Sequence, residues 1–314
     1  MLNQNKLLKQ LGIEKIVIWG LKKNYHSHYF IHLGFFNILK NKKIKVLWVE
    51  DKIQNNIFLD IKTLVIAVDV ESKNLEFDKG AYYCTHNIDT SILRNISKKR
   101  IIKLQVITYD NYKTYFKKSI KFDGVSYYDK TENTLFQSWG SSIEEKDFQK
   151  PVSFLKNKLY FEFFVGSIWN NELNQGNFEI IDEYRNLCKS KNVTFVHCKH
   201  IPEKYYSSYI KYSRYGISIV GTWQKNHGYT PCRVFKAIAS GKLGMINSNL
   251  SMKIYDYILG NNNLSKLIEN YEELNEKKLF DLIEYQQNEI KKETYAAKIS
   301  NILYCLKIKQ DFKN

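Results

Sequence analysis

The sequence is poor in proline, glycine and cysteine, with 3, 14 and 5 of these among 314 residues. The cysteines form an odd set without a C-x-x-C pair, which argues against a disulfide framework or a zinc ribbon and favours reduced thiols. No apolar run approaches the roughly 18 residues that a membrane-spanning helix needs. The N-terminus, MLNQNKLLKQLG, has neither an apolar stretch of signal-peptide length nor a small-residue cleavage site, so we expect a cytoplasmic protein. The five cysteines are Cys84, Cys188, Cys198, Cys232 and Cys305.

The chain has fewer acidic residues than basic ones. The chain has 48 lysines and arginines against 32 aspartates and glutamates, so its formal net charge is +16. This charge predicts attraction to polyanions, which include nucleic acid, an anionic membrane surface and phosphorylated substrates. The cations are spread along both halves, and the sequence contains no helix-turn-helix, zinc-finger or RNP motif. Codon bias in an AT-rich genome also produces this abundance of Lys, Asn, Ile and Tyr, which is a second explanation for part of the charge.

The length and the order of the apolar runs predict two α/β domains, covering residues 1–150 and 151–314. A polar stretch, GSSIEEKDFQKP, separates them. The first half predicts strands at Lys15–Trp19, Lys45–Val49, Leu64–Val68, Ala81–Thr85 and Ile101–Val106, helices near 28–40 and 88–97, and a hairpin at 126–139 around Lys130–Asn133. The second half predicts strands at Tyr160–Val165, Val193–His197 and Ile217–Val220, and helices near 178–189 and 202–213.

Right-handed crossovers between such strands give a parallel, doubly wound sheet in each half, so the predicted fold is two Rossmann-like domains. Ligands of open α/β sheets collect outside the carboxyl ends of the strands. We therefore expect a cleft that is lined by the loops after Trp19, Val165, His197 and Val220. The remainder, 251–314, is helical in pattern, and its last helix is a candidate to pack back on the first domain.

The segment GISIVGTWQKNHGYTPCRVFKAIASGKLGMINS, residues 216–248, is the most informative part of the chain. After the strand, 221–229 is expected to be a polar loop. Thr230 is expected to be the N-cap of a helix, with Pro231 as its first residue and Gly241 as its left-handed C-terminal cap.

Arg233 is anomalous in this position. It falls in the first turn of the helix, where the partial positive charge of the unpaired N–H groups disfavours a cation unless an anion lies there. A phosphate fits this requirement, because the guanidinium and the N–H groups near Thr230 and Cys232 would share it. Lys236 follows one turn later and is a candidate to add charge to the same anion. A solvated surface position is the alternative for both cations.

Three segments of the second half, FFVGSIW, VTFVHC and GYTPCRVFKAIASGKLGMINS, resemble the C-terminal half of glycosyltransferases of the two-Rossmann, GT-B architecture. In that class a glycine-bearing loop after the first strand of the second domain and a G-x-x-x-x-R/E-x-x-x-A-x-A-x-G helix start hold the nucleotide-sugar donor. IWGLKKNYHSHYFIHLGFF in the first half looks like the loop and helix that reach the acceptor. Many relatives have a ribose-binding glutamate where this chain has Arg233 and Lys236.

The resemblance implies a donor site, for which we expect no metal cofactor. Its implied members are Gly166, Ser167, His197, Tyr229, Thr230, Pro231, Cys232, Arg233 and Lys236. The HCKH run at 197–200 has no partner pair elsewhere with the spacing of a zinc site, and we expect His197, at the end of its strand, to contact the donor nucleotide instead. The Asp69-Val-Glu71 triplet resembles the acidic triplet of metal-dependent glycosyltransferases, but it lies in the first half on an unsuitable strand pattern, and we interpret it as coincidence. Aromatic residues in the expected cleft loops are candidates to stack on a base or a sugar, with packing in the core or at the rim as the alternative: Tyr25, Trp139, Trp169, Trp223 and Tyr229.

Inverting transfer also needs a base for the acceptor hydroxyl. His28 and His32 lie four residues apart, hence on one helix face, and His28 is near the helix start, at the junction of loop and helix. We expect His28 to be this base, with His32 and His26 as alternatives. The rival carboxylates are Glu50, Asp51, Asp69 and Asp89.

The sequence therefore predicts a metal-independent glycosyltransferase that moves a sugar from a nucleotide-diphosphate donor to a saccharide, lipid-linked saccharide or glycan, as in polysaccharide synthesis. Its partners would be the nucleotide sugar and the acceptor, with peripheral membrane contact as an option and no nucleic acid. A basic nucleic-acid-binding protein, and a sugar-nucleotide epimerase or phosphorylase of the same fold, are the alternatives.

Overall fold

The computed structural model describes residues 4–22, 27–50, 59–68, 78–88, 93–151, 158–199 and 201–311. The chain divides into two compact units. The first unit contains Met1–Val106, Lys118–Ser142 and Tyr295–Asn314, and the second contains Ile107–Lys117 and Ile143–Thr294. A single cut at residue 150 therefore does not describe the division, because a short segment of the N-terminal half belongs to the second unit and the last helix belongs to the first.

The first unit contains an eight-stranded sheet with the order β2-β1-β3-β4-β5-β8-β7-β6. Its first six strands in this order are parallel, whereas β7 is antiparallel to both β8 and β6. The strands are β1 (Lys15–Trp19), β2 (Val46–Val49), β3 (Thr63–Val68), β4 (Tyr82–His86), β5 (Ile101–Gln105), β6 (Ile120–Lys121), β7 (Tyr127–Asp129) and β8 (Thr134–Phe136). The β7–β8 hairpin turns at 130–133, as predicted, and Asn133 takes the left-handed conformation that such a turn requires.

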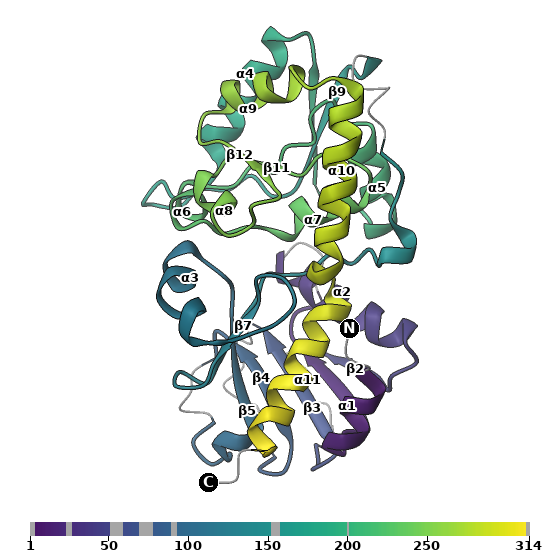
Figure 1. Ribbon diagram of the computed structural model, residues 1–314, viewed down its shortest axis with the longest axis vertical. Helices are drawn as coiled ribbons and strands as arrows, with labels where there is room; N and C mark the ends of the chain where they lie inside the picture. The colour runs from purple at the N-terminus through teal and green to yellow at the C-terminus, as the bar shows by residue number, and fades with distance from the viewer. Residues whose placement is uncertain are drawn as a thin grey trace. The chain divides into compact units, whose positions relative to one another are not determined.

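Helices cover this sheet because its central strands are apolar on both faces. Every residue of β3, TLVIAV, is buried, which is typical of a central parallel strand. The helices are α1 (Gln4–Leu11), α2 (Ser27–Asn41) and α11 (Tyr295–Asp311). Within this unit α11 packs against α1, α2 and β5, as its course over the sheet in Figure 1 shows.

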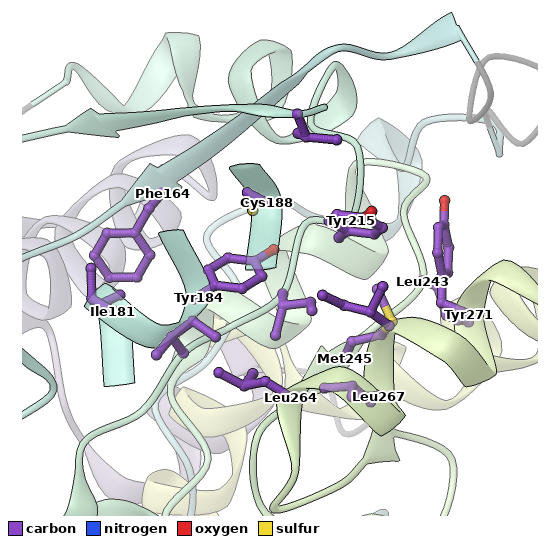
Figure 2. Close-up of a cluster of buried hydrophobic side chains, with 14 of the residues drawn as sticks. Phe164, Ile181, Tyr184, Cys188, Tyr215, Leu243, Met245, Leu264, Leu267 and Tyr271 are labelled. Carbon is purple, nitrogen blue, oxygen red and sulfur yellow. The ribbon is translucent and has the colours of Figure 1, made fainter. Parts of the chain in front are cut away.

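The second unit is built on short parallel strands: β9 (Phe161–Val165) pairs with β10 (Thr194–Cys198), and β11 (Met245–Ile246) pairs with β12 (Leu259–Gly260). Its helices are α3 (Tyr109–Tyr115), α4 (Phe178–Ser190), α5 (Glu203–Lys211), α6 (Thr222–His227), α7 (Cys232–Ala239), α8 (Asn249–Met252), α9 (Leu264–Glu272) and α10 (Glu276–Ile290). Figure 2 shows the apolar core, in which Phe164 of β9 points toward Ile181 of α4 with Tyr184 beside them. This core fixes β9 and α4, and therefore the loop between them.

Short 3-10 helices complete the described structure. They are η2 (Lys98–Arg100), η3 (Phe116–Lys118), η4 (Glu145–Asp147) and η6 (Lys291–Glu293).

Three sequence predictions need correction. The helix predicted at 88–97 is not seen at its described ends: Ile88 is non-helical, Leu93 is in a 3-10 conformation, 94–97 form a turn, and 89–92 lie outside the described residues. Residues 217–220 are buried as predicted but make only a bridge from Ser218 to Ile246 instead of a full strand. Residues 221–229 contain α6 and are not a continuous loop, because Gln224 accepts the N–H of Gly221 and Gly228 ends the helix in a left-handed cap.

A buried carboxylate binds the turn that precedes 217–220. Both carboxylate oxygens of Glu162 accept backbone N–H groups, from Tyr215 at 2.8 Å and from Gly216 at 3.0 Å. On the same turn, Lys242 Nζ donates to the Ser213 carbonyl at 2.8 Å. The Glu162 and Lys242 side chains thus take the place of strand pairing at the start of the segment. Burial raises the pKa of Glu162 and lowers the pKa of Lys242 to about 8.

Candidate anion-binding site

The candidate site lies in the second unit, where β9 and β10 end. Gly166 follows β9, and its N–H donates to the Cys198 carbonyl at 3.4 Å, while His197 Nε2 bonds the Gly166 carbonyl at 2.7 Å. A carbonyl only accepts, so Nε2 of His197 donates in this hydrogen bond. The carboxyl ends of parallel strands are the place where ligands of α/β folds bind.

The helix α7 begins at this edge one residue later than the sequence predicts. Cys232 is its first residue, Pro231 occupies the N-cap position, and no side chain caps the N–H groups. Thr230 is therefore not the cap. Its Oγ1 has no hydrogen-bond partner among the described residues although the side chain is only 3% exposed. A buried hydroxyl without a partner is costly, and a ligand oxygen at the helix start would satisfy it.

Arg233 lies in the first turn of α7, as the sequence predicts, and its guanidinium turns toward the strand ends. Nη2 donates to the Ile219 carbonyl at 2.8 Å and Nη1 to the Val165 carbonyl at 3.4 Å. The side chain is half-buried, with Cζ 5.2 Å from the ring centre of Phe164. Nε is buried and has no hydrogen-bond partner in the described part of the chain.

The charge of Arg233 is not neutralised by the residues that the structure describes. None of the ion pairs within the described ranges includes Arg233, and its acceptors are two peptide carbonyls. A half-buried cation at a helix N-terminus adds to the positive end of the helix dipole. The arrangement therefore attracts an anion, and the planar guanidinium with nearby N–H groups suits phosphate oxygens.

Gly166 is required for this position of Arg233. A Cβ at Gly166 would overlap Nη1 of Arg233, so any larger residue there displaces the guanidinium. The glycine that the sequence singled out thus allows close approach of an arginine side chain.

The loop after Gly166 is held by amide side chains. Asn177 accepts the Trp169 N–H at 2.9 Å and donates to the Ser167 carbonyl at 3.0 Å. The end of this loop is tied to the start of α6, because Thr222 N–H donates to the Gly176 carbonyl at 3.0 Å. Two loops that the sequence placed in one site are therefore joined in the structure.

Two further predicted donor-site residues, Tyr229 and Lys236, differ in their burial and their contacts. Tyr229 is half-buried between α6 and α7, and its N–H donates to the Gln224 carbonyl at 2.9 Å. Lys236 is buried, with its Nζ 5.2 Å from the ring centre of Tyr206 on α5. The Lys236 amine therefore packs on an aromatic face one turn away from Arg233.

The two histidines that were proposed as bases lie on α2 in the first unit. His28 is half-buried in the first turn of the helix. His32 has no exposed surface, its Nε2 bonds the Val68 carbonyl at 3.2 Å, and its ring packs on Gly20. Of the rivals, Glu50 is half-buried, whereas His26, Asp51, Asp69 and Asp89 lie outside the described residues, as do Tyr25 and Glu71.

Two buried polar residues at strand ends were missed by the sequence analysis. In the second unit, Asn247 bonds both the N–H and the carbonyl of Val220, at 2.7 Å and 3.1 Å. In the first unit, His86 ends β4, with its Nδ1 2.8 Å from the Leu104 carbonyl and its ring edge-on to Trp139. Both lie next to apolar strands, and that position was the available signal.

The described residues contain neither a cluster of metal ligands nor a membrane-spanning helix. His200 of the HCKH run lies outside the described residues, and no group of three or more His, Cys, Asp or Glu that could hold a metal ion is found among the residues that are described. In the same residues no helix is long and apolar enough to cross a bilayer.

The comparisons with known proteins are consistent with this geometry. No protein-family model and no curated protein matches the chain. Among solved structures, a β-glucosyltransferase described as a DNA-modifying enzyme, with the substrate uridine diphosphoglucose, is similar over 93% of this chain and 99% of its own, with a TM-score of 0.53 and 13% identity. An α-glucosyltransferase in complex with UDP is similar over 95% and 100%, with a TM-score of 0.58 and 9% identity.

The chain has the GT-B fold. This confirms the fold that the glycine-bearing loop and the helix start of the second half implied. At such low sequence identity the likeness concerns the fold alone.

Proposed function

We propose that the protein transfers a sugar from a nucleotide-diphosphate donor. The observation that carries the proposal is Arg233, a half-buried guanidinium at the start of α7 whose described partners are the Val165 and Ile219 carbonyls. The unpartnered Oγ1 of Thr230 at the same helix start is a second unsatisfied group. The two similar structures, which are described as glucosyltransferases with UDP-glucose or UDP, support a uridine diphosphate sugar as the first donor to test.

The chemistry follows from the charge of this site. When the bond between the sugar and the diphosphate breaks, negative charge grows on the leaving phosphate. A guanidinium and helix N–H groups that are already in place stabilise that charge more than they stabilise the intact donor. Arg233 would take the role that a divalent cation plays in metal-dependent enzymes, so the proposed transfer needs no metal.

The other predicted donor-site residues have supporting roles in the proposal. Gly166 and Ser167 would bring backbone groups close to the diphosphate. His197 would meet the nucleoside, with the tautomer that its bond to Gly166 sets. Tyr229 would line the route between α6 and α7.

The experiment is a thermal-shift panel of UDP, GDP, ADP and CMP with their sugar conjugates. A ligand at about 100 times its Kd stabilises the native state by about 2.7 kcal/mol, which raises the melting temperature by several degrees. We expect one diphosphate to do this in wild-type protein. Arg233→Ala should lower its affinity about 10- to 100-fold, because one charge-assisted phosphate contact is lost.

Arg185→Ala is the matched control. Arg185 is exposed on α4 and pairs with Asp182, so its loss removes one positive charge without touching the site. If Arg233→Ala and Arg185→Ala respond to the diphosphate as the wild type does, the phosphate assignment is wrong.

Two classes of acceptor for the transferred sugar fit the proposal. The sequence resemblance favours a saccharide, lipid-linked saccharide or glycan. The net charge of +16 and the DNA-modifying activity of one similar structure favour DNA instead. Once the donor is known, transfer of its labelled sugar to oligosaccharides and to duplex DNA separates them, and strong loss of DNA transfer with added salt is expected only for the second class.

The base remains a prediction from the sequence. His28→Ala should leave diphosphate binding unchanged and remove sugar transfer, and wild-type turnover in this variant would clear His28 of that role. A cytoplasmic location and peripheral contact with a membrane are likewise predictions, which fractionation of the native source would test.

A further inference from the structure

The five cysteines have sharply different environments. Four are buried, and burial raises the pKa of each of these thiols. Cys232 alone of the five is half-buried, and it is not in a disulfide. Because the thiolate is the reactive form, buried thiols with a raised pKa react slowly. The buried cysteines are Cys84, Cys188, Cys198 and Cys305.

Three positive features lie in the first turns of the helix that Cys232 begins. It is the first residue of α7, at the positive end of the helix dipole. Arg233 is the next residue, and Lys236 lies four positions on, which places it on the same face of the helix. A helix N-terminus and neighbouring cations are the features that lower thiol pKa values in reactive cysteines.

The same helix start carries independent signs of a ligand. Thr230 Oγ1 is buried without a hydrogen-bond partner in the described residues, and so is Nε of Arg233. A polar ligand at the start of the helix would supply the hydrogen-bond partner that each of these two groups lacks. Cys232 therefore begins a helix whose start also carries two buried polar groups without a partner in the described residues.

We propose that Cys232 is a peroxide-reactive thiolate that shares this site with the bound diphosphate, so that its oxidation and binding of the diphosphate exclude each other. The second half of this statement rests on the proposed function. The ligand class for the modification is a small soft electrophile, of which hydrogen peroxide is the simplest.

The reaction is a two-electron transfer. A lone pair of the Cys232 thiolate attacks one oxygen of hydrogen peroxide, a sulfur–oxygen bond forms and the oxygen–oxygen bond breaks. Hydroxide leaves with the bonding pair, and sulfur becomes sulfenic acid. Sulfur is oxidised and peroxide is reduced. Two equivalents of an added thiol then reduce the sulfenic acid back to the cysteine thiol, with a disulfide of the added thiol and water as the other products. The added oxygen occupies space at the N–H groups where a phosphate oxygen would lie.

The first test is alkylation with iodoacetamide at about pH 7, followed at each cysteine by peptide mass spectrometry. We expect Cys232 to react about tenfold faster or more than the four buried cysteines. Lys236→Met should move the pH midpoint of the Cys232 reaction upward. Equal rates at Cys232 and Cys198 would overturn the proposal.

The second test adds UDP and, separately, inorganic pyrophosphate. A saturating anion should slow alkylation of Cys232 about tenfold or more, because it occupies the same site. If UDP raises the melting temperature of the protein but leaves the alkylation rate unchanged, the shared site is wrong and the proposed function stands. If no nucleotide and no pyrophosphate stabilises the wild type, the proposed function and the exclusion fail together.

The third test compares UDP-induced stabilisation before and after hydrogen peroxide, each variant against its own untreated sample. Wild type and Cys198→Ser should lose the stabilisation and regain it with dithiothreitol. Cys232→Ser should show the same response before and after. Cys198 is the matched control because it also lies at the strand-end edge, as the last residue of β10, but is only 8% exposed. A peroxide effect that persists in Cys232→Ser would overturn the proposal.

Discussion

The guanidinium of Arg233 occupies the space next to Gly166 that a side chain at that position would need. The two residues come from different segments, one after β9 and one in α7, and they meet because both lie at the carboxyl edge of the second unit's strands. The guanidinium of Arg233 can lie here only because residue 166 has no side chain. Two motifs that look independent in the sequence are one structural feature.

Gly166→Ala tests this relationship. The new methyl group would displace Nη1 of Arg233, so we expect UDP affinity to fall about tenfold or more through loss of one charge-assisted contact. Calorimetric titration with UDP measures it. Gly12→Ala is the control: nothing lies near that Cβ, and the positive φ of Gly12 makes the substitution cost stability without changing UDP affinity. Unchanged affinity in Gly166→Ala would mean that Arg233 does not bind the anion.

Asn247→Ala tests the support of the loop after Val220. The substitution leaves the buried N–H and carbonyl of Val220 without their shared partner, so we expect the free energy of unfolding to fall by about 2–4 kcal/mol. Urea denaturation measures it. Asn262→Ala, which removes an amide bonded to an exposed backbone N–H, should cost well under about 1 kcal/mol. Similar losses in both variants would contradict the role of Asn247.

The buried pair of Glu162 and Lys242 predicts a non-additive response. Lys242→Met leaves the Glu162 carboxylate buried beside no cation, so we expect a loss of about 3 kcal/mol or more. In the double variant Glu162→Gln, Lys242→Met the buried charge is gone while the glutamine oxygen still accepts an N–H. It should therefore be more stable than Lys242→Met alone, as a double-mutant cycle of unfolding free energies would show. Additive losses would mean that the two side chains act independently.

The buried thiols predict how stability changes with pH in the presence of a reducing agent. Burial raises the pKa of Cys84 and Cys305, so each binds its proton more tightly in the folded chain than in the unfolded one. This contribution to stability is complete below the unfolded pKa near 9 and is lost as pH rises above it, by about 1.4 kcal/mol per pH unit for each thiol.

Two lysines oppose this trend. Burial lowers the pKa of Lys242 and of Lys309 to about 8, so each adds stability as pH rises from about 8 toward 10.5. The four buried cysteines outnumber them, and we expect a net fall in unfolding free energy above pH 9. Urea denaturation at pH 8.5 and at pH 10 measures the slope, and Cys84→Ala should make it shallower by about 1 kcal/mol per pH unit. A slope that Cys84→Ala leaves unchanged would show that this thiol does not titrate on unfolding.

Much of the fold could be predicted because its signals are local. Apolar runs located β1, β3, β5 and β9 to within a residue or two, and Gly241 marked the end of α7 in a left-handed cap. The prediction failed where a side-chain cap outweighs a composition that is typical of a loop. Residues 221–229 are polar and contain glycine, yet the Gln224 side chain and a left-handed Gly228 close them into α6.

The candidate site was predictable only in part. That Arg233 lies in the first turn of a helix follows from the Thr230–Pro231 start signal and the spacing to Gly241, even though the helix begins one residue later than expected. The unpartnered Thr230 hydroxyl could not be foreseen, because a threonine before a helix usually caps it. His32 could not be recognised as fully buried, since its neighbours Gly20 and Val68 come from other strands.

By itself, the sequence determined most of the strands and the longer helices, the start and the end of α7 to within one residue, and the presence of a cation in its first turn. Periodicity, caps and turn residues act over a few positions, so they can be read from the order of amino acids. The tertiary structure decided that Arg233 bonds the ends of two other segments, that Glu162 and Lys242 replace strand pairing, and that four thiols are buried while Cys232 is not. Desolvation and hydrogen-bond partners are set by residues far apart in the chain, and packing alone brings those residues together.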